Sequence, residues 1–475
     1  MSNNQTEPAS SAPTGLSGKH GGQASNTYVG FDAITPFQEQ LRKRMPGARV
    51  LLLLLVFFVA FTGLANGAMV PSINVLAHDF NTSLNRIQAI VPYFVMGNGI
   101  GLFLWGPTID RFGRKTIIVV CGILAIGINT VITLLHDYSA LMVARVLQGI
   151  FYAGMGAVPS VVLKDVYSPR EFVIYNSWLI TLFLFTPALA PLFGGWILLH
   201  LTWHWVFHII SIVVILAVIA YVIKVPETLD PEKRQPLNTM RIIKNYGTII
   251  TSPQSLWLLV LNAIFAVTIF GPPTLLPALA IGVYHIDSAH YGYVTLPIIG
   301  GIIIGVQINQ FMIKRGVSPV TMWVTGSLLQ FATLAFTLYV MFYQLHIVWI
   351  IASVSLTVVF NGFQIGNTMV IYLMRYPYMT GTASSMLNGF RIFVAGVIAN
   401  MVSHLPLYNG VTLLVMMVAV ISICTALSLG YNLIWRTGKD KKNMAVQPQA
   451  EQVVDPHQVK HIDGIDDADL EANKK

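Results

Sequence analysis

Long apolar blocks are the feature that most restricts what this 475-residue chain can fold into. Each block has roughly 20 residues, the length that an α-helix needs to cross a hydrocarbon core of about 30 Å at about 1.5 Å per residue. Hydrophobic residues make up 55% of the chain and charged residues only 10%, whereas soluble domains carry about a quarter charged residues. The sequence therefore predicts an all-α membrane protein with twelve transmembrane helices. The expected spans are 50–71, 87–107, 116–135, 140–162, 172–199, 205–225, 256–279, 291–313, 319–342, 346–371, 379–402 and 411–434.

The longest polar interruption inside this series follows the sixth span and divides the spans into two groups of six. For the N-terminal segment FDAITPFQEQLRKR, a short amphipathic helix on the inner leaflet and a plain linker are equal alternatives. The tail after the last span is acidic and lacks apolar periodicity, which is typical of a solvated, disordered segment. The predicted parts are a disordered cytoplasmic N-terminus at 1–47, a six-helix bundle at 48–225, a cytoplasmic linker at 226–255, a second six-helix bundle at 256–435 and a disordered acidic tail at 436–475.

Positive charges in the loops lie almost entirely on one side of this arrangement. If the N-terminus is cytoplasmic, the outer loops hold only Arg86. Because basic residues are retained on the cytoplasmic side, both termini are expected to be cytoplasmic. The formal net charge of +8 then reflects topology and not a nucleic-acid-binding surface. Both cysteines, Cys121 and Cys424, lie inside apolar blocks, so neither a disulfide framework nor a metal site is predicted.

The segment GPTIDRFGRK joins the second and third spans. Its glycines permit a tight turn, and its acid can pair with a neighbouring Arg or with a helix N-terminus. A charge cluster on so short a hairpin predicts a conformational latch that can form and break. The glycine spacing does not match a phosphate-binding loop, so ATP-driven transport has no support in the sequence. The predicted latch residues are Gly106, Asp110, Arg111, Gly113, Arg114 and Lys115.

This segment resembles the signature loop of the major facilitator superfamily, G-x-L-a-D-R-x-G-R-K, with Thr108 in place of Leu. The fourth span resembles the second motif of that superfamily, and the fifth span resembles its antiporter motif. NGFQIGNTMVIYLMRYPYMTGTASSMLNGF and ETLDPEKRQPLN are similar to the Bcr/CflA branch of twelve-span drug:proton antiporters. The matching residues are Arg145, Gln148 and Gly149 in span 4 and Pro191, Gly194 and Gly195 in span 5, where Ser177, Thr186 and Ala190 replace glycines of the motif.

The resemblance implies two six-helix bundles built from inverted repeats around a central cavity that works by alternating access. Spans 1, 4, 7 and 10 would line that cavity. It further implies a monomeric secondary transporter of the inner membrane, not an enzyme, that moves a small molecule through the lipid bilayer. Protons are the coupling ion that the family suggests, and no cofactor, metal or nucleic acid is implied.

Acidic residues are missing from the core of every predicted span. Members of the Bcr/CflA branch commonly carry an Asp four residues before a proline in span 1, and here Gly67 stands four residues before Pro71. The remaining candidates for proton coupling are Asp79, just beyond span 1, and Asp165, at the inner end of span 4.

Two buried cations remain, Arg145 in span 4 and Arg391 near the middle of span 11. Each costs about 2.5–3.5 kcal/mol at a helix centre, so each is expected to face a cavity or a partner. With no acid beside them, they predict a cationic cavity that favours anionic or amphipathic substrates, although Arg145 could instead bond carbonyls inside its bundle. The amides nearby could bind a polar solute or simply join helices. The candidate substrate-binding residues are Arg145, Arg391, Asn388, Asn66, Asn361 and Gln364.

Three functions fit these patterns. The first is an efflux transporter for drugs or metabolites. The second is a transporter of polycarboxylates, siderophores or other organic anions, in either direction, without coupling through span 1. The third is a membrane receptor or enzyme that has lost transport, and a latch that can break argues against it.

Overall fold

The computed structural model describes residues 34–230, 239–287, 290–343, 346–376, 380–405 and 410–436, and within these ranges the chain is helical without any strand. The first half contains α1 (Pro36–Arg44), α2 (Ala48–Gly67), η1 (Val70–Ser72), α3 (Ile73–Asp79), α4 (Leu84–Ile87), α5 (Ile90–Phe112), α6 (Arg114–Leu134), α7 (Tyr138–Val166), α8 (Pro169–His200) and α9 (His204–Lys224). The second half contains α10 (Thr239–Thr251), α11 (Pro253–Phe270), α12 (Pro272–Pro277), η3 (Ala278–Val283), α13 (Tyr291–Lys314), α14 (Pro319–Phe342), α15 (Ile347–Asn361), α16 (Ile365–Leu373), α17 (Thr380–Ser403) and α18 (Val411–Arg436).

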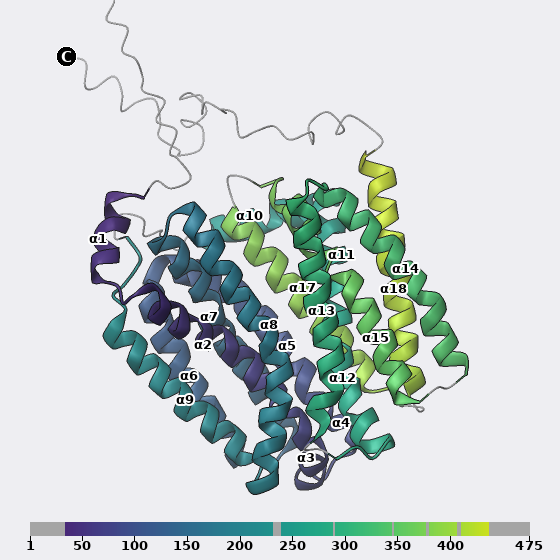
Figure 1. Cartoon of the computed structure of the whole chain (residues 1–475). Helices are drawn as coiled ribbons and strands as arrows, with labels where there is room; N and C mark the ends of the chain where they lie inside the picture. The colour runs from purple at the N-terminus through teal and green to yellow at the C-terminus, as the bar shows by residue number, and fades with distance from the viewer. Residues whose placement is uncertain are drawn as a thin grey trace, which may run out of the picture.

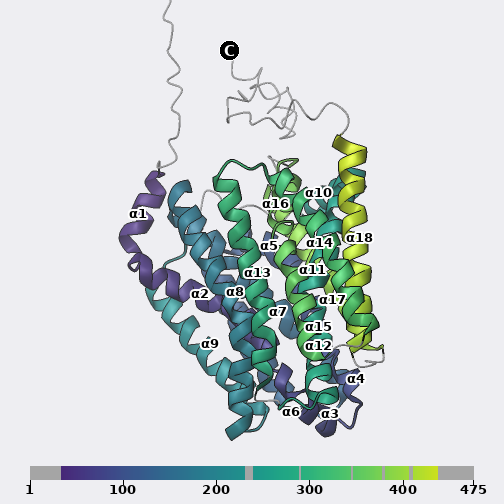
Figure 2. The ribbon, with the colours of Figure 1, turned by 45° about the vertical axis from the view of Figure 1, so that its right-hand side comes forward.

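The long helices form two bundles that stand side by side. Figure 1 shows α2 and α5–α9 in purple to teal on the left, and α11–α18 in teal, green and yellow on the right. The bundles meet where α5 packs on α17 and where α8 packs on α13. Both views place α1 and α10 at one face and α3 and α4 at the opposite face (Figures 1 and 2). Following the prediction from Lys and Arg placement, we name these the inner and the outer face.

The apolar blocks of the sequence form the membrane-length helices of the structure. Among the described residues, 11 helical stretches of 21 to 32 residues are long and apolar enough to cross a membrane. The helix α8 has 32 residues, and its part Leu189–His200 is a shorter apolar helix. With α8 the series reaches the twelve spans predicted from the sequence, in the same order and with closely similar bounds.

Three of the predicted spans are interrupted. Span 1 continues past α2 into η1 and α3, span 7 is divided into α11, α12 and the π-helix η3, and span 10 is divided into α15 and α16. The division of span 10 coincides with Gly362, where an added Cβ would lie 2.8 Å from the carbonyl carbon of Gly305 on α13. Such broken helices are typical of the elements that line a transport pathway.

The disorder predicted for all of 1–47 is corrected for residues 36–44, which form α1. Thr35 and Gln38 form a capping box at the start of this helix. Arg42 then ties it to the first bundle, because Nε donates to the carbonyl of Val166 at 3.0 Å and the guanidinium pairs with Glu171. Of the two alternatives for this segment, the helix is therefore the one observed.

In its described part, the linker predicted at 226–255 contains α10, which lies at the inner face (Figure 1), and the start of α11 at Pro253. The predicted tails at 1–33 and 437–475, together with 231–238 of the linker, lie outside the described residues.

Candidate functional site

Arg145 on α7 is fully buried and is bonded on all sides by the first bundle. Its Nε donates to the carbonyl of Ile90 at 3.0 Å, and Nη1 donates to the carbonyl of Ala65 at 3.1 Å. Nη2 donates to Asn66 Oδ1 at 2.9 Å, and Nη1 also reaches Gln148 Oε1 at 2.5 Å. These contacts join α2, α7 and the start of α5, which is the bundle-internal arrangement that the sequence left open as an alternative.

The same network continues through Asn129, a buried amide that the sequence did not single out. Gln148 Nε2 donates to Asn129 Oδ1 at 2.7 Å. Asn129 Nδ2 in turn donates to the hydroxyls of Tyr152 and Ser211, each at 2.9 Å. The polar chain thus crosses the bundle from α2 to α6 and α9, and it fixes the position of Arg145.

A second amide cluster lies in the other bundle, around the break between α15 and α16. Gln364 Nε2 donates to Gln330 Oε1 at 2.8 Å, and its Oε1 accepts from Ser327 Oγ at 3.0 Å. Asn361 Nδ2 donates to the carbonyl of Phe265 at 3.0 Å. Two buried atoms of this cluster, Gln330 Nε2 and Asn361 Oδ1, have no hydrogen-bond partner among the described residues. Unlike the network in the first bundle, this cluster therefore retains polar atoms that a solute or water could satisfy.

Among the described residues, Arg391 lacks the kind of hydrogen-bond partners that hold Arg145. No hydrogen bond or salt bridge within the described part of the chain reaches its guanidinium, and the side chain is partly exposed. Gly389 and Gly396 face α5, where their added Cβ atoms would lie 2.9 and 2.7 Å from the nearest atoms. At about 100° per residue, Arg391 lies on roughly the opposite side of α17. Its neighbours one turn away, Leu387 and Ala395, are fully buried, so this side of α17 faces protein and not lipid.

In the part of the chain that the structure describes, the side chain of Asn388 forms no hydrogen bond with Arg391. Its Nδ2 donates to the carbonyl and the hydroxyl of Ser384, at 3.0 and 3.3 Å, within the same helix. The structure thus groups Arg145 with Asn66 in one bundle and Asn361 with Gln364 in the other, and among the described residues it shows no hydrogen bond from Arg391 to either group.

The predicted latch is built around Arg114, which is 6% exposed. Its Nε donates to Asp165 Oδ2 at 2.8 Å, Nη2 lies 3.4 Å from Asp110 Oδ1, and Nη1 donates to the carbonyl of Ile109 at 3.1 Å. Asp165, predicted as a weak candidate for proton coupling, is therefore the principal partner of the latch arginine. The cluster joins the inner ends of α5, α6 and α7.

Glu227, just after α9, completes the latch. Its carboxylate accepts the backbone N–H groups of Arg114 at 2.9 Å and of Lys115 at 3.0 Å, so it caps the positive N-terminus of α6. Gly113 has φ +93°, and an added Cβ there would lie 2.4 Å from Glu227 Oε2. Only glycine meets both conditions without strain. The sequence contained this acid in ETLDPEKRQPLN, but the separation of 113 residues from Arg114 hid the contact.

The remaining charged residues of the latch, Lys115 and Arg111, are more exposed than Arg114. Lys115 Nζ donates to the carbonyl of Val222 at 2.7 Å, which attaches the latch to α9. Arg111 is exposed, with its guanidinium carbon 5.6 Å from the ring centroid of Phe112.

Gly106 connects the latch region to the second bundle. A Cβ at Gly106 would lie 2.6 Å from Ser385 Oγ on α17. One turn away, Phe103 meets Gly389 on one side and the Tyr246 ring of α10, at 6.0 Å between centroids, on another. Burial raises the pKa of the Tyr246 phenol above its usual value, so this hydroxyl stays neutral. The inner ends of the two bundles and the linker helix therefore meet at one place.

The span 5 motif sets how closely α8 approaches α2. A Cβ at Gly194 would lie 1.9 Å from the carbonyl oxygen of Ala68, and Pro191 and Gly195 beside it are buried. A Cβ at Gly67 would lie 2.8 Å from Ala190 Cβ. The position that carries an acid in the related branch is thus filled by helix packing.

Asp79, the other coupling candidate, lies at the outer end of α3 and accepts the indole N–H of Trp203 at 2.7 Å. No group of three or more His, Cys, Asp or Glu side chains that could hold a metal ion occurs in the described ranges.

Two helical bundles of membrane length, broken spans and the charged cluster around Arg114 are typical of a membrane transporter. The Major Facilitator Superfamily model matches residues 53–400, and the chain belongs to that family. The chain is 28% identical over 362 residues to the bicyclomycin resistance protein homolog of Haemophilus influenzae, across 74% of this chain and 88% of that protein. It is 30% identical over 155 residues to multidrug resistance protein D of Escherichia coli, across 33% and 39% of the two chains.

The fold agrees with solved structures. The crystal structure of a peptide transporter, POT, in complex with sulfate superposes with a TM-score of 0.67 at 14% identity, covering 85% of this chain and 99% of that one. At this identity the likeness shows the fold alone. The family model and the two relatives confirm the resemblance to the major facilitator superfamily and its Bcr/CflA branch that the motifs predicted.

Proposed function

We propose that this transporter exports small organic molecules from the cytoplasm across the inner membrane by alternating access, and that it prefers anionic or amphipathic substrates. The names of two relatives, a bicyclomycin resistance protein homolog and a multidrug resistance protein, support export of drug-like compounds. Antiport against protons fits this family, with Asp165 or Asp79 as the candidate coupling acids in the absence of an acid in span 1.

The observation that carries the anion preference is the contrast between the two arginines. A guanidinium at membrane depth costs about 2.5–3.5 kcal/mol unless it finds partners. Arg145 finds them in two carbonyls and two amides. Arg391 has none among the described residues and lies on a side of α17 that faces protein. An anionic group of the substrate would supply the missing partner, because carboxylates and phosphates match the guanidinium fork.

Transport into proteoliposomes tests this proposal. Flux is measured for a panel of organic acids and of cationic drugs, with and without a pH gradient, for the native chain, Arg391→Lys and Arg391→Gln. Anion flux should fall in Arg391→Lys, which keeps the charge but lacks the planar fork, and should fall further in Arg391→Gln. Loss of a charged hydrogen bond corresponds to about 1.5–3 kcal/mol of anion binding. Cation flux should change little, and equal losses for both substrate classes would contradict the anion preference.

A further inference from the structure

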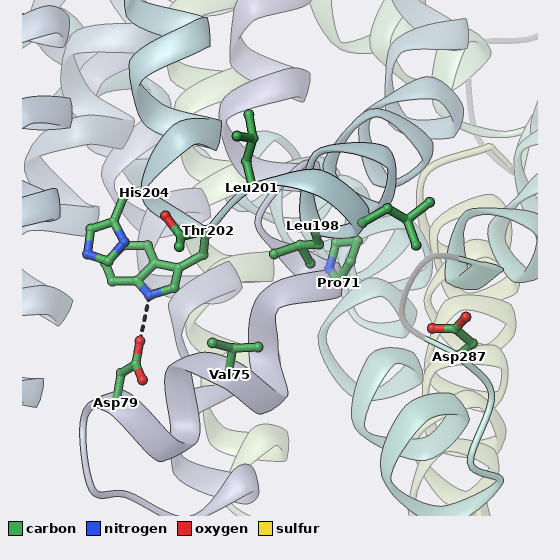
Figure 3. Close-up of a pocket in the computed structure, with 10 residues that line it drawn as sticks. Pro71, Val75, Asp79, Leu198, Leu201, Thr202, His204 and Asp287 are labelled. Atoms are coloured by element: carbon green, nitrogen blue, oxygen red, sulfur yellow. Dashed lines mark hydrogen bonds between the residues drawn. The ribbon is translucent and has the colours of Figure 1, made fainter.

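A cavity of about 450 Å³ lies at the outer face, between the two bundles. This volume falls in the range of small-molecule sites, about 300–1,000 Å³. Its wall is mostly apolar, with Pro71 and Val75 from the extension of span 1 and Leu198 from the end of α8. Figure 3 shows Asp79 and His204 at one end of the cavity and Asp287 at the other, with the apolar side chains between them.

The polar groups of this cavity favour positive charge. Two carboxylates line it, and its lining within the described residues includes no Lys or Arg. Asp79 Oδ2 accepts the indole N–H of Trp203 at 2.7 Å, and the Trp203 ring stacks on His204 at 3.8 Å between centroids. This bond, the stacking and a contact of Asp79 Oδ1 with His78 Nδ1 at 3.6 Å hold the carboxylate at the cavity edge. At the other end, Asp287 Oδ2 lies 3.3 Å from His290 Nδ1, so a ligand would share each carboxylate with these partners. A molecule with an apolar body and a cationic group matches both the wall and the ends.

The lining residues come from both bundles. Asp287 follows η3 in the second bundle, whereas the others belong to the first. A ligand that contacts Asp79 and Asp287 together can do so only while the outer ends of the bundles are close. By linkage, such a ligand stabilises this arrangement over one in which the outer face opens.

We propose that this outer cavity binds amphipathic organic cations, and that a bound cation holds the outer face closed and thereby inhibits export. The inhibition rests on the proposed transport function, whereas the binding does not.

Binding is tested on the purified full-length chain by titration calorimetry with benzyltrimethylammonium, with benzenesulfonate as the matched anion. The cation should bind, and Asp79→Asn and Asp287→Asn should each weaken its binding about threefold to fivefold, the effect expected of an exposed charge pair. Asn at position 79 can still accept the Trp203 N–H, so the fold is preserved. Asp137→Asn is the control: it removes a charge from the same face and keeps an N-cap for α7, because Asn and Asp cap equally well. Absence of cation binding, equal binding of the anion, or unchanged binding in both cavity variants would overturn the site.

Measurement of export flux tests whether the bound cation inhibits transport. Benzyltrimethylammonium added outside should slow export by the native chain, and Asp287→Asn should require about threefold to fivefold more of it for the same inhibition. Cation binding with undiminished export would overturn the inhibitory role and leave the site standing. A chain that binds the cation but transports nothing on the panel would instead contradict the proposed function.

Discussion

At the scale of single residues, the two intramembrane arginines are held in opposite ways, so their contributions to stability can be separated. Replacing Arg145 by Leu would leave the side-chain oxygens of Asn66 and of the buried Gln148 without this donor. It would also remove one hydrogen bond each from the carbonyls of Ile90 and Ala65. A stranded buried acceptor costs about 1–3 kcal/mol. Replacing Arg391 by Leu would strand no acceptor in the described ranges and would remove a costly charge. Thermal unfolding in one detergent should therefore show a large loss for Arg145→Leu and little change or a gain for Arg391→Leu. Equal losses would mean that Arg391 is also a structural residue.

Gly67 offers a second test at this scale, because it fills the place of the missing acid. A Cβ there would lie 2.8 Å from Ala190 Cβ, so Gly67→Ala should overpack the α2–α8 contact and cost about 1–3 kcal/mol. Removing the opposing methyl group with Ala190→Gly should recover part of that loss in the double variant. The melting temperatures of both single variants and the double variant check this, and strictly additive losses would refute direct packing between the two residues.

At the scale of elements, α6 depends on a cap supplied from beyond α9. Glu227 accepts the N–H groups of both Arg114 and Lys115. Glu227→Ala should destabilise the fold by about 0.5–2 kcal/mol, as loss of an N-cap does, and should reduce transport by loosening the latch. Glu227→Gln keeps an acceptor but loses the charge, so its effect should be smaller. Glu39→Ala on α1, an exposed acid paired only with Lys43 in the described ranges, is the matched control for melting temperature and flux. Transport equal to that of the control would show that the cap is dispensable.

Most elements could be predicted from the sequence because hydropathy and length alone decide which segments cross a bilayer. The breaks in spans 7 and 10 were not predicted, although Gly271, Pro272 and Pro273 mark the first of them in the sequence. The break near Gly362 coincides with a close approach to Gly305 on another helix. A contact between two segments that are distant in the chain cannot be predicted from the residues around the break. For the same reason the motif identified Arg114 but not its cap Glu227. The buried amides Asn129 and Gln330 looked like ordinary polar residues in apolar spans until the fold placed them beside Gln148 and Gln364.

At the scale of the whole molecule, the two bundles contact each other mainly through two helix pairs. The contact between α5 and α17 is the more extensive, and that between α8 and α13 is the smaller. The helices α5 and α17 are close from the inner to the outer side, at Gly106 with Ser385, Gly99 with Phe393, and Gly396 with Met96. The small residues let these two helices approach at each level. The other pair, α8 and α13, is in close contact at its outer end, where a Cβ at Gly292 would lie 2.3 Å from Leu192 Cδ2. If the bundles rock against each other, the contacts at the inner and outer ends of these helix pairs must break in each transport cycle.

The pair Gly106 and Ser385 allows this motion to be tested. A Cβ at Gly106 would lie 3.4 Å from Ser385 Cβ, close to the separation of about 3.5–4.5 Å found in disulfides. In a background with Cys121→Ala and Cys424→Ala, Gly106→Cys with Ser385→Cys should form a disulfide on oxidation. The bond should stop transport by holding the inner ends of the bundles together, and a reductant should restore the flux of the unoxidised variant.

The control is a disulfide inside one bundle. Gly122 on α6 would place a Cβ 3.9 Å from Val218 Cβ on α9, so Gly122→Cys with Val218→Cys should also cross-link in the same background. Because α6 and α9 belong to the same bundle, this bond should leave transport nearly unchanged when the bundles move as rigid bodies. Full transport with the Gly106–Ser385 disulfide in place would exclude separation of the inner ends from the cycle. Equal inhibition by both disulfides would instead mean that the first bundle itself deforms during transport, and alternating access by rigid rocking would have to be abandoned for this chain.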